Sequence, residues 1–415
     1  MNATDFTTDA DYSRIPFSLY HSRELYERER ERIFKGPVWC YLCLDVELPE
    51  AGSFLTTYVG DIPVLVNRAA DGTLRAFENR CEHRGNKLRR ELRGKDNAHS
   101  CIYHQWCYDL EGKLLSVPFS RGVGGHGGLP KDFDKSKIRL NELRVATFCG
   151  VVFGTFSAEA PPLDSYLGER VMGMMRALFH KPVKVLGYQR QHILGNWKLY
   201  NENLRDPNHG GLLHSFHATF SLCRLSQTGG AHMDPEFRHN ISFIMGQDNK
   251  EAMAEGYGET REVVQEEYSL RDPEMLKFYP ELPTPETLII LSVFPNVIFQ
   301  MISNSLCTRQ IRPRGIDEME LYWTYYGFAD DTPEMTEHRR LQANMVGPAG
   351  LVSMEDGEAV ELVHNETRSA PGNASRVIIG GTGELRNQES MVTEVPIRGF
   401  WRYYYQTMDL APAQP

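Results

Sequence analysis

Cys81-Glu-His83 and Cys101-Ile-Tyr-His104 are the two stretches that decide how this chain folds. Each pairs a thiol with an imidazole, and seventeen residues separate the two pairs. Asp71-Gly72 is typical of a hairpin turn. Strand-like runs flank both pairs, at residues 54–59, 62–67, 73–77, 106–110 and 113–117. We therefore expect both pairs to lie on loops at hairpin tips of a small all-β module.

Two thiols and two imidazoles form the ligand set of a Rieske [2Fe–2S] cluster, in which the cysteines bind one iron and the histidines the other. The neutral imidazoles raise the reduction potential from about −400 mV to about −150 mV or above. A structural zinc ion accepts the same residue types. Zinc fingers usually pair cysteine with cysteine and histidine with histidine, whereas each arm here has one of each. The pattern favours the cluster and predicts transfer of single electrons.

Length and composition describe the rest of the chain. A module of this kind needs about a hundred residues, so 415 residues predict a further domain. The net charge of −10 argues against nucleic acid or an anionic membrane as partner. No apolar run approaches the roughly 20 residues of a membrane span, and the acidic N-terminus does not resemble a signal peptide. The cytoplasm is the expected location, which agrees with eight cysteines serving as thiols.

We predict three parts. Residues 1–37 form an N-terminal helical segment that packs on the catalytic domain, with a helix over 22–35 capped by Ser22. Residues 38–156 form the cluster domain. Residues 157–415 form the second domain, which follows a boundary near Pro161-Pro162. Helical stretches alternate there with long strand-like runs, which predicts an α+β fold.

The motif Asp206-Pro-Asn-His209-Gly-Gly-Leu-Leu-His214 carries the chemistry of the second domain. Histidines five residues apart lie about 140° apart on an ideal helix, so they share a metal only if the helix breaks between them. The two glycines after His209 supply such a break. Two histidines plus a carboxylate form the ligand triad of non-haem Fe(II) oxygenases. Coupled to the cluster motif, this pattern predicts a mononuclear iron site.

The chain resembles the large subunit of ring-hydroxylating Rieske non-haem iron oxygenases over nearly its whole length. The resemblance rests on the cluster motif, on Asn196-Trp-Lys-Leu-Tyr with Glu202-Asn203, on the motif from Asp206 to His214, and on Gly347-Pro-Ala-Gly-Leu-Val-Ser-Met-Glu-Asp-Gly357. It implies a Rieske domain joined to a helix-grip catalytic domain with an antiparallel sheet. It also implies a trimer of large subunits, usually as α3β3 with a small β subunit.

The resemblance also assigns roles to residues. His209 and His214 match the two imidazole ligands of the iron. The third ligand is expected to be Asp356, with Glu355 as the alternative. Asp206 matches the bridging aspartate, which in the family hydrogen-bonds an iron-ligand histidine and a cluster histidine of the adjacent subunit. A helix-surface acid without such a role is the alternative for Asp206.

Electrons are expected to come from NAD(P)H through a separate reductase, with or without a ferredoxin, since the sequence contains no dinucleotide-binding fingerprint. The similarity is greatest to the terephthalate dioxygenase and salicylate 5-hydroxylase branch, on Leu225-Ser-Gln, Ile290-Leu-Ser-Val-Phe-Pro295, Arg309-Gln and Ile397-Arg-Gly-Phe-Trp401. This branch implies an aromatic carboxylate such as terephthalate, salicylate or anthranilate, with one or two oxygen atoms retained. Arg309 and Arg398 are the candidates to bind the carboxylate, because a guanidinium donates two parallel hydrogen bonds to it.

Two alternatives remain from the sequence. The first is a Rieske electron-transfer protein without oxygenase activity, and the second is an assembly subunit whose second domain has lost its iron. Intact His209, His214 and Asp356 argue against both.

Overall fold

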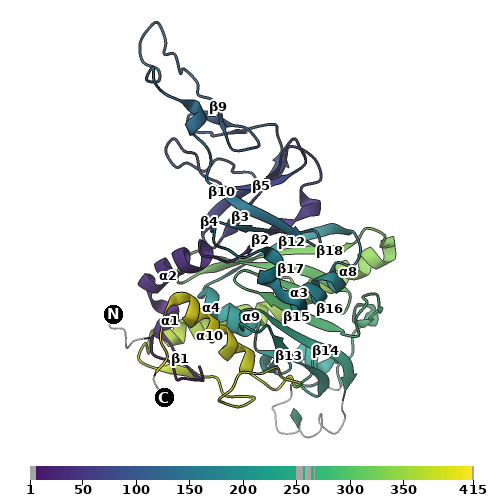
Figure 1. Cartoon of the computed structure of the whole chain (residues 1–415). Coiled ribbons are helices and arrows are strands. Elements are labelled where there is room, and N and C mark those ends of the chain that lie inside the picture. Colours follow the sequence, from purple (N-terminus) through teal and green to yellow (C-terminus); the bar gives the residue numbers. More distant parts are fainter. Residues whose placement is uncertain (1–5, 249–255, 258–262, 266, 414–415) are drawn as a thin grey trace. The chain divides into compact units, whose positions relative to one another are not determined.

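The computed structural model describes residues 6–248, 256–257, 263–265 and 267–413. The chain divides into two compact units (Figure 1). One contains Phe34–Leu163, and the other combines Met1–Ile33 with Asp164–Pro415. No helix in the described ranges is both long and apolar enough to cross a membrane.

The unit Phe34–Leu163 contains a seven-stranded antiparallel sheet and a small three-stranded antiparallel sheet. The large sheet has the order β2 (Cys40–Leu44), β11 (Val151–Thr155), β10 (Glu142–Phe148), β5 (Leu74–Glu78), β4 (Ile62–Arg68), β3 (Ser53–Val59) and β6 (Arg93–Lys95). The small sheet has the order β7 (His99–Ser100), β8 (Cys107–Tyr108) and β9 (Leu114–Ser116). Two 3-10 turns, Asp45–Glu47 and Lys135–Lys137, complete its regular elements. The prediction of an all-β module is confirmed.

One apolar core joins the two sheets of this unit. Phe54, Leu65 and Phe77 of the large sheet pack with Tyr108 and Leu114 of the small sheet. The same core contains the cysteines at positions 81 and 101. The packing therefore fixes two loop tips close together, although they are separate in the sequence.

The other unit is built on a second seven-stranded antiparallel sheet. Its order is β12 (Val183–Ile193), β18 (Met319–Phe328), β17 (Ser305–Pro313), β16 (Val297–Ile302), β15 (Leu288–Val293), β14 (Asn240–Asp248) and β13 (Gln227–Met233). Every residue of β16 and β17 is buried, as expected for central strands with a covered face.

Helices pack on this sheet and complete the α+β class that the sequence predicts (Figure 1). The helices of this unit are α1 (Ser18–His21), α2 (Arg23–Glu29), α3 (Leu163–Leu178), α4 (Trp197–Asn203), α5 (Pro207–Gly210), α6 (Ser215–Thr219), α8 (Pro333–Val346), α9 (Leu351–Arg368) and α10 (Val395–Met408), together with a π-helical turn at Arg30–Phe34 and a 3-10 turn at Pro273–Leu276. Of these, α9 contacts β12, α4 contacts β17 and α10 contacts β13.

The N-terminal segment, up to Ile33, packs on the unit that contains Asp164–Pro415. Strand β1 (Arg14–Pro16) pairs with β19 (Ala374–Arg376). The buried carboxylate of Glu29, in α2, accepts hydrogen bonds from Lys198 Nζ at 2.6 Å, Trp197 Nε1 at 2.7 Å and Tyr404 Oη at 2.5 Å. These bonds satisfy both oxygens of a charge that would otherwise be costly to bury.

Candidate functional site

Two short helices position His209 and His214. Helix α5 begins after Asp206, whose Oδ1 accepts hydrogen bonds from the backbone N–H groups of Asn208 at 3.0 Å and His209 at 3.2 Å. The helix ends at Gly210, and α6 begins only after His214. The break that the sequence predicted between the two histidines is therefore present.

Asp356 brings the third donor from a distant part of the chain. It lies in α9 and is 3% exposed. Its Oδ1 lies 3.3 Å from His209 Nε2 and 3.2 Å from His214 Nε2. The structure therefore gathers two imidazole nitrogens and one carboxylate oxygen at one point, and this donor set fits a non-haem Fe(II) ion.

The local charges suit a cation at this point. Burial lowers the pKa of His209, but the carboxylates of Asp206 and Asp356 outweigh burial and raise that pKa to about 10. Burial raises the pKa of Asp356, but the two imidazoles outweigh burial and hold it well below its usual value. The carboxylates thus stabilise positive charge on the histidine side of the site, as they would stabilise a bound metal ion.

Glu355 takes a different place from its neighbour. Its Oε2 lies 2.7 Å from His214 Nδ1, on the opposite side of the ring from Nε2. A carboxylate in this place fixes the orientation of an imidazole and makes it a better metal ligand. The sequence analysis expected Asp356 with Glu355 as the alternative, and the structure brings Asp356, not Glu355, to both Nε2 atoms.

Asn203 belongs to the site, although the sequence analysis gave it no role. Its Nδ2 donates to Asp356 Oδ1 at 3.0 Å and lies 3.2 Å from His209 Nε2. Asp206 reaches the same histidine from the other side, with Oδ2 3.6 Å from Nδ1, an ion-pair distance longer than a hydrogen bond. The only sequence signal for Asn203 was its place in the Glu202-Asn203 motif, six residues before His209.

A pocket opens beside the three donors. It encloses about 540 Å³ of space that atoms do not fill, part of it open to solvent. Most of its wall is apolar, and the polar side chains include His217, Ser242 and Arg309. The apolar lining comes from Leu204, Pro207, Leu288, Ile290, Ile302, Val352 and Met391. An apolar pocket with few polar groups suits an aromatic ring.

Arg309 is the buried cation of this pocket. It lies in β17, is 3% exposed, and stacks 4.6 Å from the ring centroid of Trp323 on the neighbouring strand β18. Its Nη1 donates to Tyr200 Oη at 3.0 Å, while its buried Nε has no hydrogen-bond partner in the described part of the chain. Among the described acidic side chains, none forms an ion pair with Arg309.

Arg398 is placed elsewhere. It lies in α10, and its two terminal nitrogens donate to the backbone carbonyls of Gly381 at 3.0 Å and Gly383 at 2.7 Å. Asp11 Oδ2 lies 3.6 Å from Nη1. Arg398 does not line the pocket that contains Arg309. Arg398 therefore binds the loop that contains Gly381 and Gly383, and it does not lie with His209, His214 and Asp356.

The second set of candidate ligands lies on two loops of the all-β unit. Cys81 and Cys101 are buried, whereas His83 is exposed and His104 half-buried. The two imidazole centroids are 4.6 Å apart, and the ring of His83 stacks on Trp106. Thiols in the core and imidazoles toward solvent match a cluster held by two cysteines on one iron and two histidines on the other.

Hydrogen-bond donors surround the two sulfurs. Tyr108 Oη lies 3.4 Å from Cys81 Sγ, and Asn86 Nδ2 donates to Cys101 Sγ at 3.6 Å. Burial raises the pKa of Cys101, but hydrogen bonds from the Tyr103 backbone and Asn86 outweigh it and lower that pKa. Donors of this kind stabilise thiolates and tune a cluster's potential. The residues present therefore fit a [2Fe–2S] cluster.

Comparison with known proteins agrees with this geometry. Residues 38–129 match the Rieske [2Fe-2S] domain, and residues 182–409 match the catalytic domain of the ring hydroxylating alpha subunit. The chain is 43% identical to the anthranilate 1,2-dioxygenase large subunit of Burkholderia cepacia, with 96% of this chain and 94% of that protein covered. It is 42% identical to the terephthalate 1,2-dioxygenase terminal oxygenase component subunit alpha 2 of Comamonas sp., with 96% of each covered.

A solved structure shares the fold of this chain. The crystal structure of naphthalene 1,2-dioxygenase from Rhodococcus sp. bound to indole superposes with a TM-score of 0.77 at 22% identity, covering 95% of this chain and 94% of that one. The two domains imply a Rieske [2Fe–2S] cluster and a mononuclear iron as cofactors, which sets the zinc alternative aside. The chain therefore belongs to the family of alpha, or large, subunits of Rieske ring-hydroxylating oxygenases.

Proposed function

We propose that this oxygenase subunit hydroxylates an aromatic carboxylate of the benzoate type, such as a terephthalate-, salicylate- or anthranilate-like acid. The observation that carries the proposal is Arg309, a buried guanidinium that bonds Tyr200 and, among the described residues, feels the charge of Asp356 but forms no ion pair with a carboxylate. An unpaired buried charge is costly, and a substrate carboxylate would pair it through parallel hydrogen bonds. The apolar wall of the same pocket suits the ring.

We further propose the ligands of the two cofactors. His209, His214 and Asp356 hold the mononuclear Fe(II), and the cluster is held by Cys81, His83, Cys101 and His104. When bound, these groups supply oxygen activation with electrons delivered one at a time. The chain's own contribution is to orient the ligands, through Glu355 on His214 Nδ1 and Asn203 on Asp356, and to hold the substrate by its carboxylate next to the iron ligands.

Asp206 is proposed as the bridge to a cluster histidine of a neighbouring copy. Besides the pocket with Arg309, Asp206 lines a second hollow, together with Glu202, Leu213 and Glu394. Asp206 therefore also borders a hollow other than the proposed substrate pocket. This arrangement supports a role in passing an electron to the iron site.

The relatives named above are large or alpha subunits of oxygenases with several components, so the chain works with further oxygenase components and an electron-transfer chain. In finer detail, we propose an α3β3 assembly with a small β subunit, fed from NAD(P)H by a reductase with or without a ferredoxin. All eight cysteines are free, which supports a reducing compartment such as the cytoplasm.

Reconstitution tests the proposal. The purified oxygenase, supplied with a reductase and NADH, is offered a panel of benzoates and the matching benzamides while oxygen uptake and products are measured. We expect hydroxylated products from one or more acids and little from the neutral amides. Hydroxylation of the amides at equal rates would contradict carboxylate recognition. Iron analysis distinguishes the oxygenase from a pure electron carrier. The carrier would hold about two irons per chain and the oxygenase about three.

A further inference from the structure

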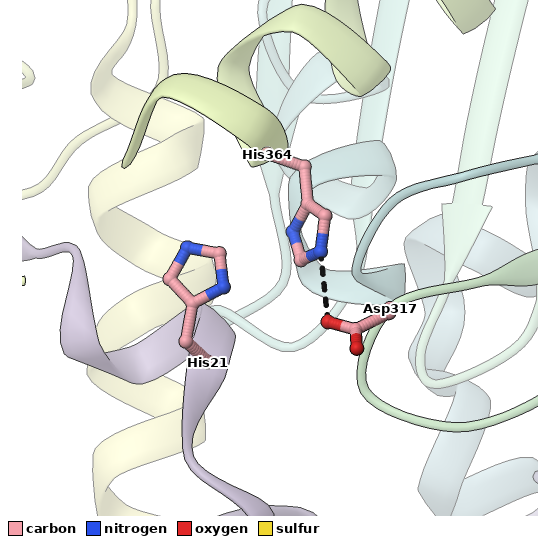
Figure 2. A group of neighbouring side chains, drawn as sticks. All are labelled: His21, Asp317 and His364. Atoms are coloured by element: carbon pink, nitrogen blue, oxygen red, sulfur yellow. Dashed lines mark hydrogen bonds and ion pairs between the residues drawn. The ribbon is translucent and has the colours of Figure 1, made fainter. Parts of the chain in front are cut away.

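Three side chains from distant segments meet outside the catalytic pocket (Figure 2). His21 ends helix α1, Asp317 lies in the turn between β17 and β18, and His364 lies in α9. One nitrogen of each histidine and one oxygen of the aspartate all lie within 4.8 Å of one another. The two imidazole centroids are 4.6 Å apart. None of the three lines the pocket that contains Arg309.

The hydrogen bonds of His21 determine which of its nitrogens carries the proton. The hydroxyl of Thr367 donates to the backbone carbonyl of Val363 at 2.6 Å. Since a hydroxyl has one proton, its oxygen must accept the bond from His21 Nε2, at 3.0 Å. The proton of neutral His21 is therefore on Nε2, and Nδ1 has a lone pair. Nδ1 is buried and has no hydrogen-bond partner among the described residues.

His364 lies between two groups with opposite demands. Its Nε2 is 3.1 Å from Asp317 Oδ1, which only accepts hydrogen bonds, and 3.0 Å from Arg368 Nη2, which only donates them, so the two contacts favour opposite tautomers of His364. His364 Nδ1 is buried and has no hydrogen-bond partner in the described ranges. In Figure 2 the ring nitrogen of His364 that is not bonded to Asp317 lies on the side facing His21.

Both rings are neutral near pH 7. Burial, together with the nearby His364 and Arg368, which disfavour a second positive charge, lowers the pKa of His21 to about 4. Burial also lowers the pKa of His364, although Asp317 opposes this. Neutral imidazole is the form that binds metal ions. In metal sites the second ring nitrogen usually donates to an acceptor outside the ligand set, as His21 Nε2 does to Thr367 Oγ1.

We propose that one nitrogen of His21, one nitrogen of His364 and one carboxylate oxygen of Asp317 form a second metal site, which binds a first-row divalent ion such as Zn²⁺. Two nitrogens and one oxygen are a donor set that such ions accept. Buried polar atoms nearly always have a partner, so the two Nδ1 atoms without one in the described chain need an explanation. A single water that donates to both nitrogens is the competing occupant.

A nearby positive charge lowers the affinity of the proposed site for a metal ion. Arg368 Nη2 donates to Asp317 Oδ1 and lies 3.0 Å from His364 Nε2. The side chain of Arg368 is about half exposed, so it competes with a metal ion for Asp317 and is free to turn into solvent. Lys198, the other nearby cation, already pairs with the buried carboxylate of Glu29. The positive charge of Arg368 therefore weakens the site, and its removal should strengthen it.

A metal ion here would join the N-terminal segment to the catalytic sheet and to helix α9. It would bind the folded protein and not the unfolded chain, and would therefore raise the melting temperature. The inference does not depend on the substrate or on turnover, so its failure and that of the proposed function are distinguishable.

The test uses the full oxygenase in the His209→Ala background, so that the candidate iron site does not take up Zn²⁺. After dialysis against a chelator, we expect titration with Zn²⁺ to load one equivalent per chain and to raise the melting temperature. His21→Ala and His364→Ala should each weaken binding by about tenfold or more. His338→Gln is the matched control, because His338 has one buried nitrogen without a partner in the described chain but belongs to neither group of candidate metal ligands found among the described residues.

Arg368→Gln keeps the test decisive if the histidine variants fold poorly. It should tighten Zn²⁺ binding by up to about fivefold, since it removes a competing cation, and misfolding cannot produce such a gain. The cluster's EPR signal reports that each variant is folded. The proposal is overturned if Zn²⁺ fails to bind, or if His21→Ala and His364→Ala bind it as well as the background protein does. Binding unchanged by Arg368→Gln would also remove the assigned ligand Asp317.

Discussion

Replacing Arg309 tests the substrate class most directly. Methionine keeps the length of the side chain and its contact with Trp323 but removes the charge. If Arg309 pairs with the substrate carboxylate in a largely dry pocket, its loss leaves a desolvated anion without a partner, which costs about 2–5 kcal/mol. We expect kcat/KM for the preferred benzoate to fall roughly 30- to 5,000-fold in Arg309→Met. Arg309→Lys should recover part of it, because an ammonium lacks the planar two-point contact.

The control comes from the same strand. Arg312 is also buried, and it pairs with Glu320 at 3.2 Å and stacks 4.1 Å from the ring centroid of Tyr322. Arg312 lies three residues after Arg309, so its side chain is on the opposite face of the strand, and it does not line the pocket. Arg312→Met should lower stability without changing the preference for charged over neutral rings.

The assay is steady-state product formation with a benzoate and its benzamide, at matched iron content for each variant. The ratio of the two kcat/KM values, and not the absolute loss, carries the answer. If Arg309→Met lowered both values equally, Arg309 would be a structural residue of β17. The carboxylate assignment would then fail, because the other candidate arginine already bonds backbone carbonyls elsewhere.

Three further predictions follow from the site and its surroundings. Asp206→Asn keeps an oxygen to cap α5 but removes the charge beside His209, so turnover should fall about 10- to 100-fold with iron content unchanged; near-normal turnover would remove the bridging role. His209→Ala should lower the iron content from about three to about two per chain while the cluster's EPR signal remains, and retention of the third iron would contradict its role as a ligand. Burial raises the pKa of Glu202 from 4.5 to about 7, despite hydrogen bonds from Tyr20 and Trp401 that lower it. A raised carboxyl pKa gives stability that is present below the unfolded-state pKa and lost as pH rises through 7, so native stability should fall by about 3 kcal/mol between pH 4 and 8 relative to Glu202→Gln. Parallel melting-temperature profiles of the two proteins would refute this.

Short-range patterns were readable from the sequence because the ligands on each segment are close together along the chain. The two Cys-His pairs lie within one module of strands and turns, so local spacing predicted a cluster fold before any packing was known. The same holds for His209 and His214, where the intervening glycines predicted the helix break that the structure has. The α+β class of the second domain followed from alternating helical and strand-like runs.

Local spacing could not predict which of two adjacent residues with similar chemistry faces the site. Glu355 and Asp356 are both acids, yet consecutive residues of a helix point about 100° apart. One therefore meets His214 Nδ1 and the other both Nε2 atoms. Arg309 was preferred over Arg398 in the sequence, but only the fold shows that Arg309 borders the pocket and that Arg398 binds backbone carbonyls.

The sequence by itself determined the cluster module, the histidine pair and the family. Only the tertiary structure showed that Asp356 lies at both Nε2 atoms, that Asn203 contacts it, and that His21, Asp317 and His364 meet at all. The physical reason is that local spacing is set by backbone geometry, whereas contacts between distant segments depend on how β17, β18 and α9 pack. That packing depends on the surface buried across the whole domain, and a short motif contains no information about it.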